Sequence, residues 1–228
     1  MKFLTLAQFT EMWKLQDELN TQTSGPDWKE KNQNWNLAIK SEVMEFFDYI
    51  GWKWWKEPDA KKKPSDMQAR LELVDIWHFL LSSIIETSRG GSETYHRELE
   101  HYFSIQGRWA HTVEELQFMD SFNSRRAAVV CLTSVILACE WSWDELYKAY
   151  IGKVALNAFR QANGYKEGTY QKIWKTLEAP LPELNNIELE DNYFLEQILT
   201  ELSLTPGGLT YQAVYHKLGI EYMLRYNN

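Results

Sequence analysis

The spacing of apolar positions is helical along most of the chain. Apolar side chains recur three and four residues apart from Thr5 to about Asn20, from about Asn36 to Lys56 and from Ser65 to about Ser88. Thr5-x-x-Gln8 and Ser65-x-x-Gln68 have the spacing of a capping box at a helix start. Gly and Pro lie between the predicted helices, in TQTSGPDW and EPDAKKKP, and favour loops there.

The second half of the chain follows the same pattern with weaker signals. Residues 92–111 are less regular and allow one short helix. Thr112-x-x-Glu115 and Ser142-x-x-Glu145 indicate two further helix starts, and the second of these helices reaches about Ala162. Two amphipathic helices then end the chain, at about Leu189–Leu202 and Leu209–Arg225. No strand alternation is evident, so we predict an all-α helical bundle with antiparallel neighbours.

We expect residues 1–228 to form a single all-α domain. A linker that contains Pro180 and Pro182 precedes the last two predicted helices. Two alternatives stay open for the chain from about residue 183: a C-terminal helical subdomain, or a tail that packs on the bundle or on a partner chain.

Composition and charge narrow the classes of partner. Hydrophobic residues make up 44% of the chain, which is enough for a sizeable core, and the net charge is −8. An acidic surface repels nucleic acid and anionic membranes, so we expect neither as a partner. It does not exclude an anionic small molecule, provided that metal ions lie between the phosphates and the protein.

The two cysteines and the apolar segments predict a soluble, cytoplasmic protein. Cys131 and Cys139 lie eight residues apart on one predicted helix, too far from each other for a disulfide, and are expected to be buried thiols. The apolar run Ala127–Cys139 is shorter than the roughly 20 residues that span a bilayer. The N-terminal segment meets polar residues too early for a signal peptide.

Two acidic pairs stand out against their apolar surroundings. Glu42 and Glu45 are three residues apart on the predicted second helix, and Glu72 and Asp75 repeat this spacing on the third. Four carboxylates between two neighbouring helices repel one another unless cations lie between them. Mg²⁺ suits such an all-oxygen site and also binds phosphate. The alternative is that each acid pairs with a surface lysine or arginine.

Cations and amides that suit a nucleotide occur at three further places. Lys53 and Lys56 follow the first acidic pair on the same predicted helix, although lysines beside tryptophans are often ordinary surface residues. Gln16 and Asn20 are one turn apart near the start. One face of the helix from Ser142 carries four polar side chains, and a polar loop follows: Lys153, Asn157, Arg160 and Gln161, then Asn163, Gly164, Tyr165, Lys166 and Gly168.

With these residues the chain resembles the all-α dUTPases, a homodimeric family within the all-α NTP pyrophosphatases. The family signature ExxE…ExxD reads Glu42-Val43-Met44-Glu45 and Glu72-Leu73-Val74-Asp75 here. That pattern alone is weak. Longer matching segments make it specific, namely LQDELN, GWKWWK, ELVDIWHF and YIGKVALNAFRQANGYKEGTYQKIW.

The resemblance implies a Mg²⁺-dependent hydrolase that converts dUTP, and also dUDP, to dUMP. It implies that the four acids hold two or more Mg²⁺ ions, with Mn²⁺ as a substitute, and that Glu42 also orients or deprotonates the attacking water. Gln16, Asn20 and Asn157 would read uracil, and Trp52 would pack in the nucleotide pocket. Phosphate contacts would come from Lys53, Arg160, Lys166 and Lys172, and Asn163 and Tyr165 would help to hold the nucleotide. Lys56 and Lys153, which stand out by their positions in the sequence, complete the predicted substrate contacts.

Three other functions stay open at this stage. A dCTPase or another NTP pyrophosphatase would keep the acidic pairs and change the base-reading residues. A di-iron carboxylate bundle would use the Glu-x-x-His-like spacings Asp75-x-x-His78 and Glu93-x-x-His96. His78 is better explained as a hydrogen-bonded core histidine or as a residue that supports a metal ligand. A non-catalytic helical interaction module would need none of the four acids for anything but stability.

Overall fold

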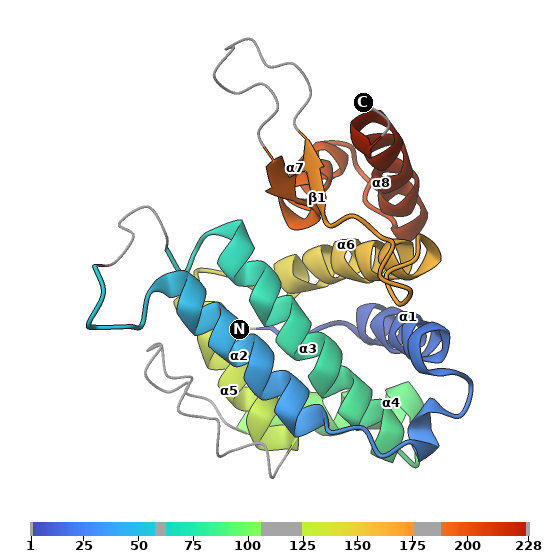
Figure 1. The fold of residues 1–228 in the computed structure, drawn as a ribbon. Coiled ribbons are helices and arrows are strands. Elements are labelled where there is room, and N and C mark those ends of the chain that lie inside the picture. Colours follow the sequence, from blue (N-terminus) through green and yellow to red (C-terminus); the bar gives the residue numbers. More distant parts are fainter. Residues whose placement is uncertain (1, 58–62, 106–124, 176–187, 227–228) are drawn as a thin grey trace. The chain divides into compact units, whose positions relative to one another are not determined.

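The structure is a computed structural model that describes residues 2–57, 63–105, 125–175 and 188–226. It is 72% helical, with eight α-helices, one 3-10 turn and one small two-stranded sheet among the described residues. This confirms the predicted all-α class. The chain divides into two compact units, Met1–Tyr150 and Ile151–Asn228. Figure 1 shows the elements of both units along the chain.

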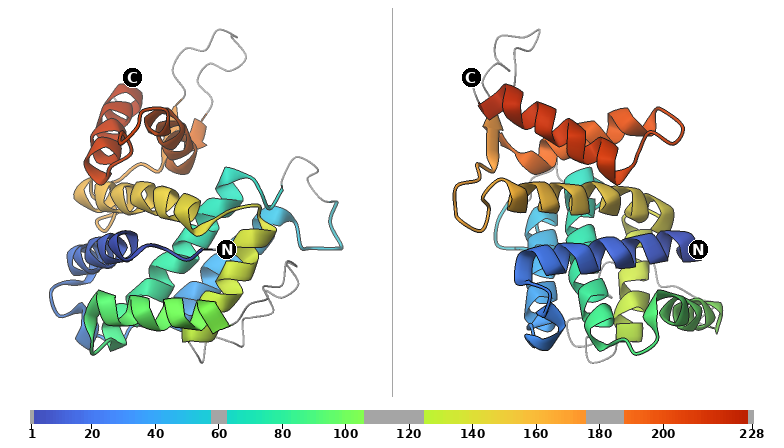
Figure 2. Two further views of the ribbon diagram at one scale, coloured as in Figure 1. Left: turned by 180° about the vertical axis from the view of Figure 1, so that it is seen from behind. Right: turned by 90° about the vertical axis from the view of Figure 1, so that its right-hand side faces the viewer.

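The first unit is organised around one strongly apolar helix, α3. Its helices are α1 (Leu6–Ser24), α2 (Trp35–Ile50), α3 (Met67–Thr87), α4 (Gly91–Ile105), α5 (Arg125–Ala138) and the first part of α6 (Trp143–Ala162), with the 3-10 turn η1 (Trp28–Glu30) after α1. Helix α3 contacts α1, α2 and α5. The right-hand view of Figure 2 shows α2, α3 and α5 side by side and crossed by α1. Residues of α3 that face these neighbours are fully buried, among them Leu71, Val74 and Trp77.

Caps fix the ends of the two helices that begin the first unit. Thr5 and Gln8 form the predicted capping box, with Gln8 N donating to Thr5 Oγ1 at 3.3 Å and Thr5 N donating to Gln8 Oε1 at 3.0 Å. Helix α1 runs four residues beyond the expected end, and Gly25 follows it with a φ of 91°. Asn34 is the N-cap of helix α2, and its side-chain oxygen accepts the N–H of Leu37.

Helix α2 ends six residues earlier than predicted. Gly51 adopts a left-handed conformation with a φ of 77°, and its N–H donates to Phe47 O. This conformation terminates a helix and is easily reached only by glycine. Lys53 and Lys56 therefore lie in the turns after α2 and not on the same helix as Glu42 and Glu45.

The second unit contains the rest of α6, β1 (Ile173–Lys175), β2 (Glu188–Glu190), α7 (Asp191–Ser203) and α8 (Tyr211–Tyr226). The two strands pair in antiparallel register, with Trp174 opposite Leu189. They contradict the expectation that no strand is present, because three-residue strands are too short to produce a visible alternation. Helices α7 and α8 contact each other, and Trp174 and Phe194 stack at 5.3 Å between ring centroids.

The remaining predicted boundaries lie within two residues of the observed ones, apart from α4. Residues 91–105 form a full helix where only a short one was expected. Ser142 caps α6 as predicted, with Glu145 N donating to Ser142 Oγ at 3.2 Å. The predicted start at Thr112-x-x-Glu115 lies outside the described residues. Cys131 and Cys139 are free thiols; Cys139 is buried as expected, whereas Cys131 is half-buried.

Candidate active site

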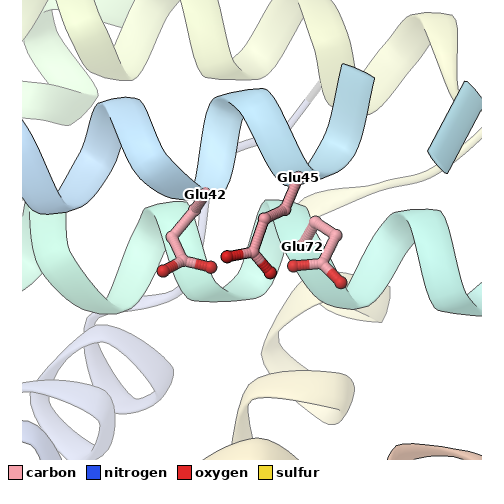
Figure 3. Close-up of side chains that lie close together, drawn as sticks. All are labelled: Glu42, Glu45 and Glu72. Atoms are coloured by element: carbon pink, nitrogen blue, oxygen red, sulfur yellow. The ribbon is translucent and has the colours of Figure 1, made fainter. Parts of the chain in front are cut away.

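Three of the four predicted acids meet between α2 and α3. Glu42 and Glu45 on α2 and Glu72 on α3 each offer a carboxylate oxygen, and these oxygens all lie within 4.8 Å of one another. Figure 3 shows the three carboxylates gathered where the two helices lie against each other. Glu42 and Glu72 are half-buried, and Glu45 is exposed. The convergence predicted from the two sequence spacings is therefore confirmed for these three side chains.

The apolar faces of the two helices bring the carboxylates together. On α2, Val43 and Phe46 are fully buried next to the acids, and Leu71 and Leu73 flank Glu72 on α3. Packing of these residues fixes the two helices and leaves the acids at the edge of their contact. Like charges at such distances repel, so the arrangement is unfavourable by itself and becomes favourable when a divalent cation is shared. The donor set, all carboxylate oxygen, fits Mg²⁺.

Asp75 lies one helical turn after Glu72 and is half-buried, but it is not one of the three residues in the 4.8 Å group. Its side chain follows Glu72 at the i+3 position, which keeps both on one side of α3. Its role as a fourth metal ligand stays a prediction.

Gln16 and Asn20 belong to a buried chain of hydrogen bonds. Gln16 Nε2 donates to Asn20 Oδ1 at 3.0 Å, and Asn20 Nδ2 donates to Ser82 Oγ at 3.0 Å. The Gln16 oxygen lies 2.6 Å from His78 Nδ1 and accepts the Tyr150 hydroxyl at 2.9 Å. His78 is thus a hydrogen-bonded core histidine, as expected. Tyr150 was not predicted, because no local spacing connects it with a residue 134 positions away.

The aromatic segment after α2 is largely exposed. Trp52, Trp54 and Trp55 form edge-to-face contacts with centroid distances of 5.4 and 5.5 Å, and Trp54 is 87% exposed. Lys53 Nζ lies 2.6 Å from Asp48 Oδ1, and this ion pair holds the pKa of Asp48 below its usual value. Trp52 and Lys53 are therefore both tied to Asp48, one turn after Glu45 on α2.

In the second unit, Arg160 has a buried acidic partner. Its Nη2 and Nε donate to the two carboxylate oxygens of Asp191 at 2.6 and 2.8 Å, and the Tyr170 hydroxyl donates to Asp191 at 2.9 Å. Arg160 Nη1 also donates to Asn157 Oδ1, and Lys153 Nζ donates to Asn192 Oδ1. The predicted polar face of α6 is present, but Asp191 was not foreseen as the partner of Arg160.

The predicted loop residues lie after α6. Asn163 Nδ2 donates to Phe159 O at 2.8 Å, and Tyr165 and Lys166 are exposed. Lys172 is also exposed, and its carbonyl oxygen accepts the N–H of Asp191. These contacts are structural. The nucleotide-binding roles of the loop residues stay predictions.

The di-iron alternative does not fit the geometry of its second motif. Glu93 is exposed and pairs with Arg97 at 3.5 Å, one turn along α4. His96 is buried and its Nε2 lies 2.7 Å from Leu4 O. The two residues therefore point to different surroundings and do not form a joint ligand pair.

A comparison with protein families decides the class of the protein. The family model described as dUTPase matches residues 8–165, more than half of the chain. The chain belongs to the dUTPase family. This dUTPase is accordingly an enzyme, a dUTP diphosphatase, of a family that generally uses a divalent metal.

The family match runs from the first turn of α1 to the loop after α6 and includes all four predicted acids, whereas Lys166 and Lys172 lie beyond it. A comparison of this dUTPase with curated proteins found no match. Among the described residues, no helix is both long and apolar enough to cross a membrane.

Proposed function

We propose that the enzyme hydrolyses dUTP and dUDP to dUMP in a Mg²⁺-dependent reaction, with two or more Mg²⁺ ions and with Mn²⁺ as a substitute. The carboxylate cluster of Glu42, Glu45 and Glu72 is the observation that supports this proposal, because its oxygens lie within 4.8 Å of one another. Pyrophosphate is the second product from dUTP, and inorganic phosphate is the second product from dUDP.

The residues of the cluster have distinct tasks in this proposal. Glu42, Glu45, Glu72 and Asp75 hold the cations. Bound Mg²⁺ supplies charge neutralisation for the phosphates and a more acidic water. Glu42 is half-buried and holds the attacking water, whose proton its carboxylate accepts. No residue of the chain needs to form a covalent intermediate.

Base recognition is assigned to the amides of Gln16 and Asn20. Their buried position makes a mismatched base costly, because water cannot replace a missing hydrogen bond there. The same proposal includes further roles in the nucleotide site. Asn157 contacts uracil and Trp52 packs against the nucleotide. The other substrate contacts come from Lys53, Lys56, Lys153, Arg160, Asn163, Tyr165, Lys166 and Lys172. A homodimer in the cytoplasm completes it.

The decisive experiment is product analysis with purified protein. With Mg²⁺ present, we expect dUTP to give dUMP and pyrophosphate and dUDP to give dUMP and phosphate, and EDTA should stop both reactions. Glu42→Gln and Asp75→Asn should each abolish release of pyrophosphate while the helical circular dichroism persists. Full activity of either variant would contradict the metal-ligand assignment and favour a role in stability alone.

A parallel assay separates the proposed substrate from its nearest rival. Turnover of dUTP, dCTP, dTTP and dATP is compared at one Mg²⁺ concentration. A strong preference for dCTP would contradict the substrate proposal but leave the carboxylate chemistry unchanged. Sedimentation velocity of the same sample tests the homodimer.

A further inference from the structure

The oxygen of the Gln16 side chain is held by two donors from different elements. The Tyr150 hydroxyl on α6 donates to it at 2.9 Å, and His78 Nδ1 on α3 lies 2.6 Å from it. A glutamine oxygen can only accept, so the second contact places the ring hydrogen of His78 on Nδ1. The rings of His78 and Tyr150 stack at 4.4 Å with an interplanar angle of 27°. The His78 and Tyr150 side chains therefore pack on each other while both contact the Gln16 amide oxygen.

Two donors fill both lone pairs of the Gln16 oxygen, which leaves only N–H groups for a ligand. One hydrogen of Gln16 Nε2 already points to Asn20 Oδ1. The other has no partner within the part of the chain that the structure describes. Gln16 is only 3% exposed, so a ligand group that fails to accept this hydrogen finds no water to compensate.

We propose that Tyr150 and His78 are positioning residues that hold Gln16 as an obligatory donor toward carbon 4 of the base. Uracil carries an oxygen acceptor at that carbon, whereas cytosine carries an amine donor. The same fixed N–H therefore pairs with a uracil base and opposes a cytosine base. This inference rests on the proposed role of Gln16 and names how that role selects the base.

The Tyr150 side chain is suited to this task. It is fully buried, and burial raises the pKa of its phenol well above the usual value, so the hydroxyl keeps its hydrogen at any working pH. The same hydroxyl also lies 3.0 Å from Met12 O on α1, so the Met12 carbonyl oxygen and the Gln16 oxygen share its single hydrogen. Without the Tyr150 hydroxyl, one lone pair of the Gln16 oxygen loses its donor, and the amide can rotate to present that oxygen to the base.

The test is binding of the nucleosides deoxyuridine and deoxycytidine, measured by titration calorimetry, because it needs neither metal nor hydrolysis. For the original protein we expect tighter binding of deoxyuridine. Tyr150→Phe should lower this preference by roughly three- to tenfold, mainly by weakening deoxyuridine, as expected for one lost hydrogen bond. With dUTP as substrate, the same change should raise KM more than it lowers kcat.

Two further sets of variants keep the inference open to contradiction. His78→Ala should reproduce the loss of preference, and His78→Asn, which retains an N–H near the position of Nδ1, should restore part of it. Tyr147→Phe is the matched control, since the Tyr147 hydroxyl donates to Glu11 at 2.6 Å one turn earlier on α6. This control should leave the preference unchanged.

The outcomes separate this inference from the proposed function. An unchanged nucleoside preference in folded Tyr150→Phe and His78→Ala would overturn the inference while dUTP hydrolysis stands. Conversely, the unaltered protein could fail to hydrolyse dUTP while Tyr150→Phe and His78→Ala lower its preference for deoxyuridine. That result would support the inference and contradict the proposed reaction.

Discussion

Carboxylates at two places in this enzyme have opposite surroundings. Asp191 in the second unit is completely buried, and three polar groups, two from Arg160 and one from Tyr170, occupy its oxygens at 2.6 to 2.9 Å. Glu45 in the first unit is exposed and makes no hydrogen bond or ion pair within the described ranges, although two more glutamates approach it within 4.8 Å.

The difference indicates where each acid contributes. A buried carboxylate with a bidentate arginine is satisfied by the chain itself, so its removal harms the fold. Carboxylates that gather at the edge of an apolar contact repel one another, so this cluster contributes little to folding and provides affinity for a cation. Activity and stability should therefore respond to different acids.

The largest expected effect is on activity. Glu45→Gln keeps the size of the side chain and removes one negative charge from the cluster. We expect Mg²⁺-dependent hydrolysis of dUTP to fall by about a thousandfold or more, since several kcal/mol of transition-state stabilisation depend on the bound metal. The melting temperature should stay the same or rise slightly. Glu93→Gln, which changes an exposed glutamate on α4, is the control and should remain active.

The next effect is on stability in the second unit. Asp191→Asn leaves the Arg160 charge without its buried counter-charge, which typically costs about 3–5 kcal/mol. Hydrogen exchange of the α7 and α8 amides should accelerate accordingly. Glu201→Gln on the same helix breaks only a surface pair with Lys217 and should cost less than about 1 kcal/mol. Equal effects of the two changes would contradict the contrast between buried and exposed acids.

The effect of Mg²⁺ on thermal stability tests the same contrast between the two kinds of acid. A cation at a hundredfold excess over its dissociation constant adds about 2.7 kcal/mol of stability, which corresponds to roughly 5–10 °C in Tm for a chain of this size. We expect MgCl₂ to raise the Tm of the unaltered enzyme by this order, and NaCl at equal ionic strength to do less. Glu45→Gln should lose the increment. Its persistence would place the cation elsewhere.

The local parts of this picture could be predicted from the sequence. Glu42 and Glu45 are three residues apart in an apolar helix and therefore lie on one side of it. Glu72 and Asp75 have the same spacing on the next helix. Helical geometry then requires them to converge if the two helices are neighbours. Capping at Thr5 was equally local. By contrast, continued apolar residues after Ile50 suggested a longer helix, and the left-handed Gly51 overrode that pattern.

Contacts between distant positions could not be predicted in this way. Tyr150 reaches Gln16 across 134 positions, and Asp191 reaches Arg160 across 31. Each residue is an ordinary helix residue in its own segment, and only tertiary packing gives it a partner. A predicted phosphate contact such as Arg160 therefore needed the fold to show that a buried carboxylate already binds it.

The smallest expected effect concerns pH and tests whether the surroundings of Asp191 act as one unit. Burial, followed by the negative charge of Asp191, raises the pKa of Tyr170 above its usual value. Because the pKa is higher in the folded state than the unfolded value of about 10, the contribution of Tyr170 to stability is complete below pH 10. It is lost progressively as the pH rises above that value, when the unfolded chain ionises first. Between pH 9 and pH 11 the loss should be about 1.4 kcal/mol.

Thermal melts at pH 8 to pH 11 measure this loss. Tyr170→Phe should be less stable at pH 8, since Asp191 loses a donor, but its Tm should decline less steeply toward pH 11. Tyr193→Phe on α7 removes an exposed phenol and should follow the unaltered enzyme at every pH. Parallel curves for the enzyme and Tyr170→Phe would mean that Tyr170 titrates as it does in the unfolded chain. The arginine alone would then account for the stability of Asp191.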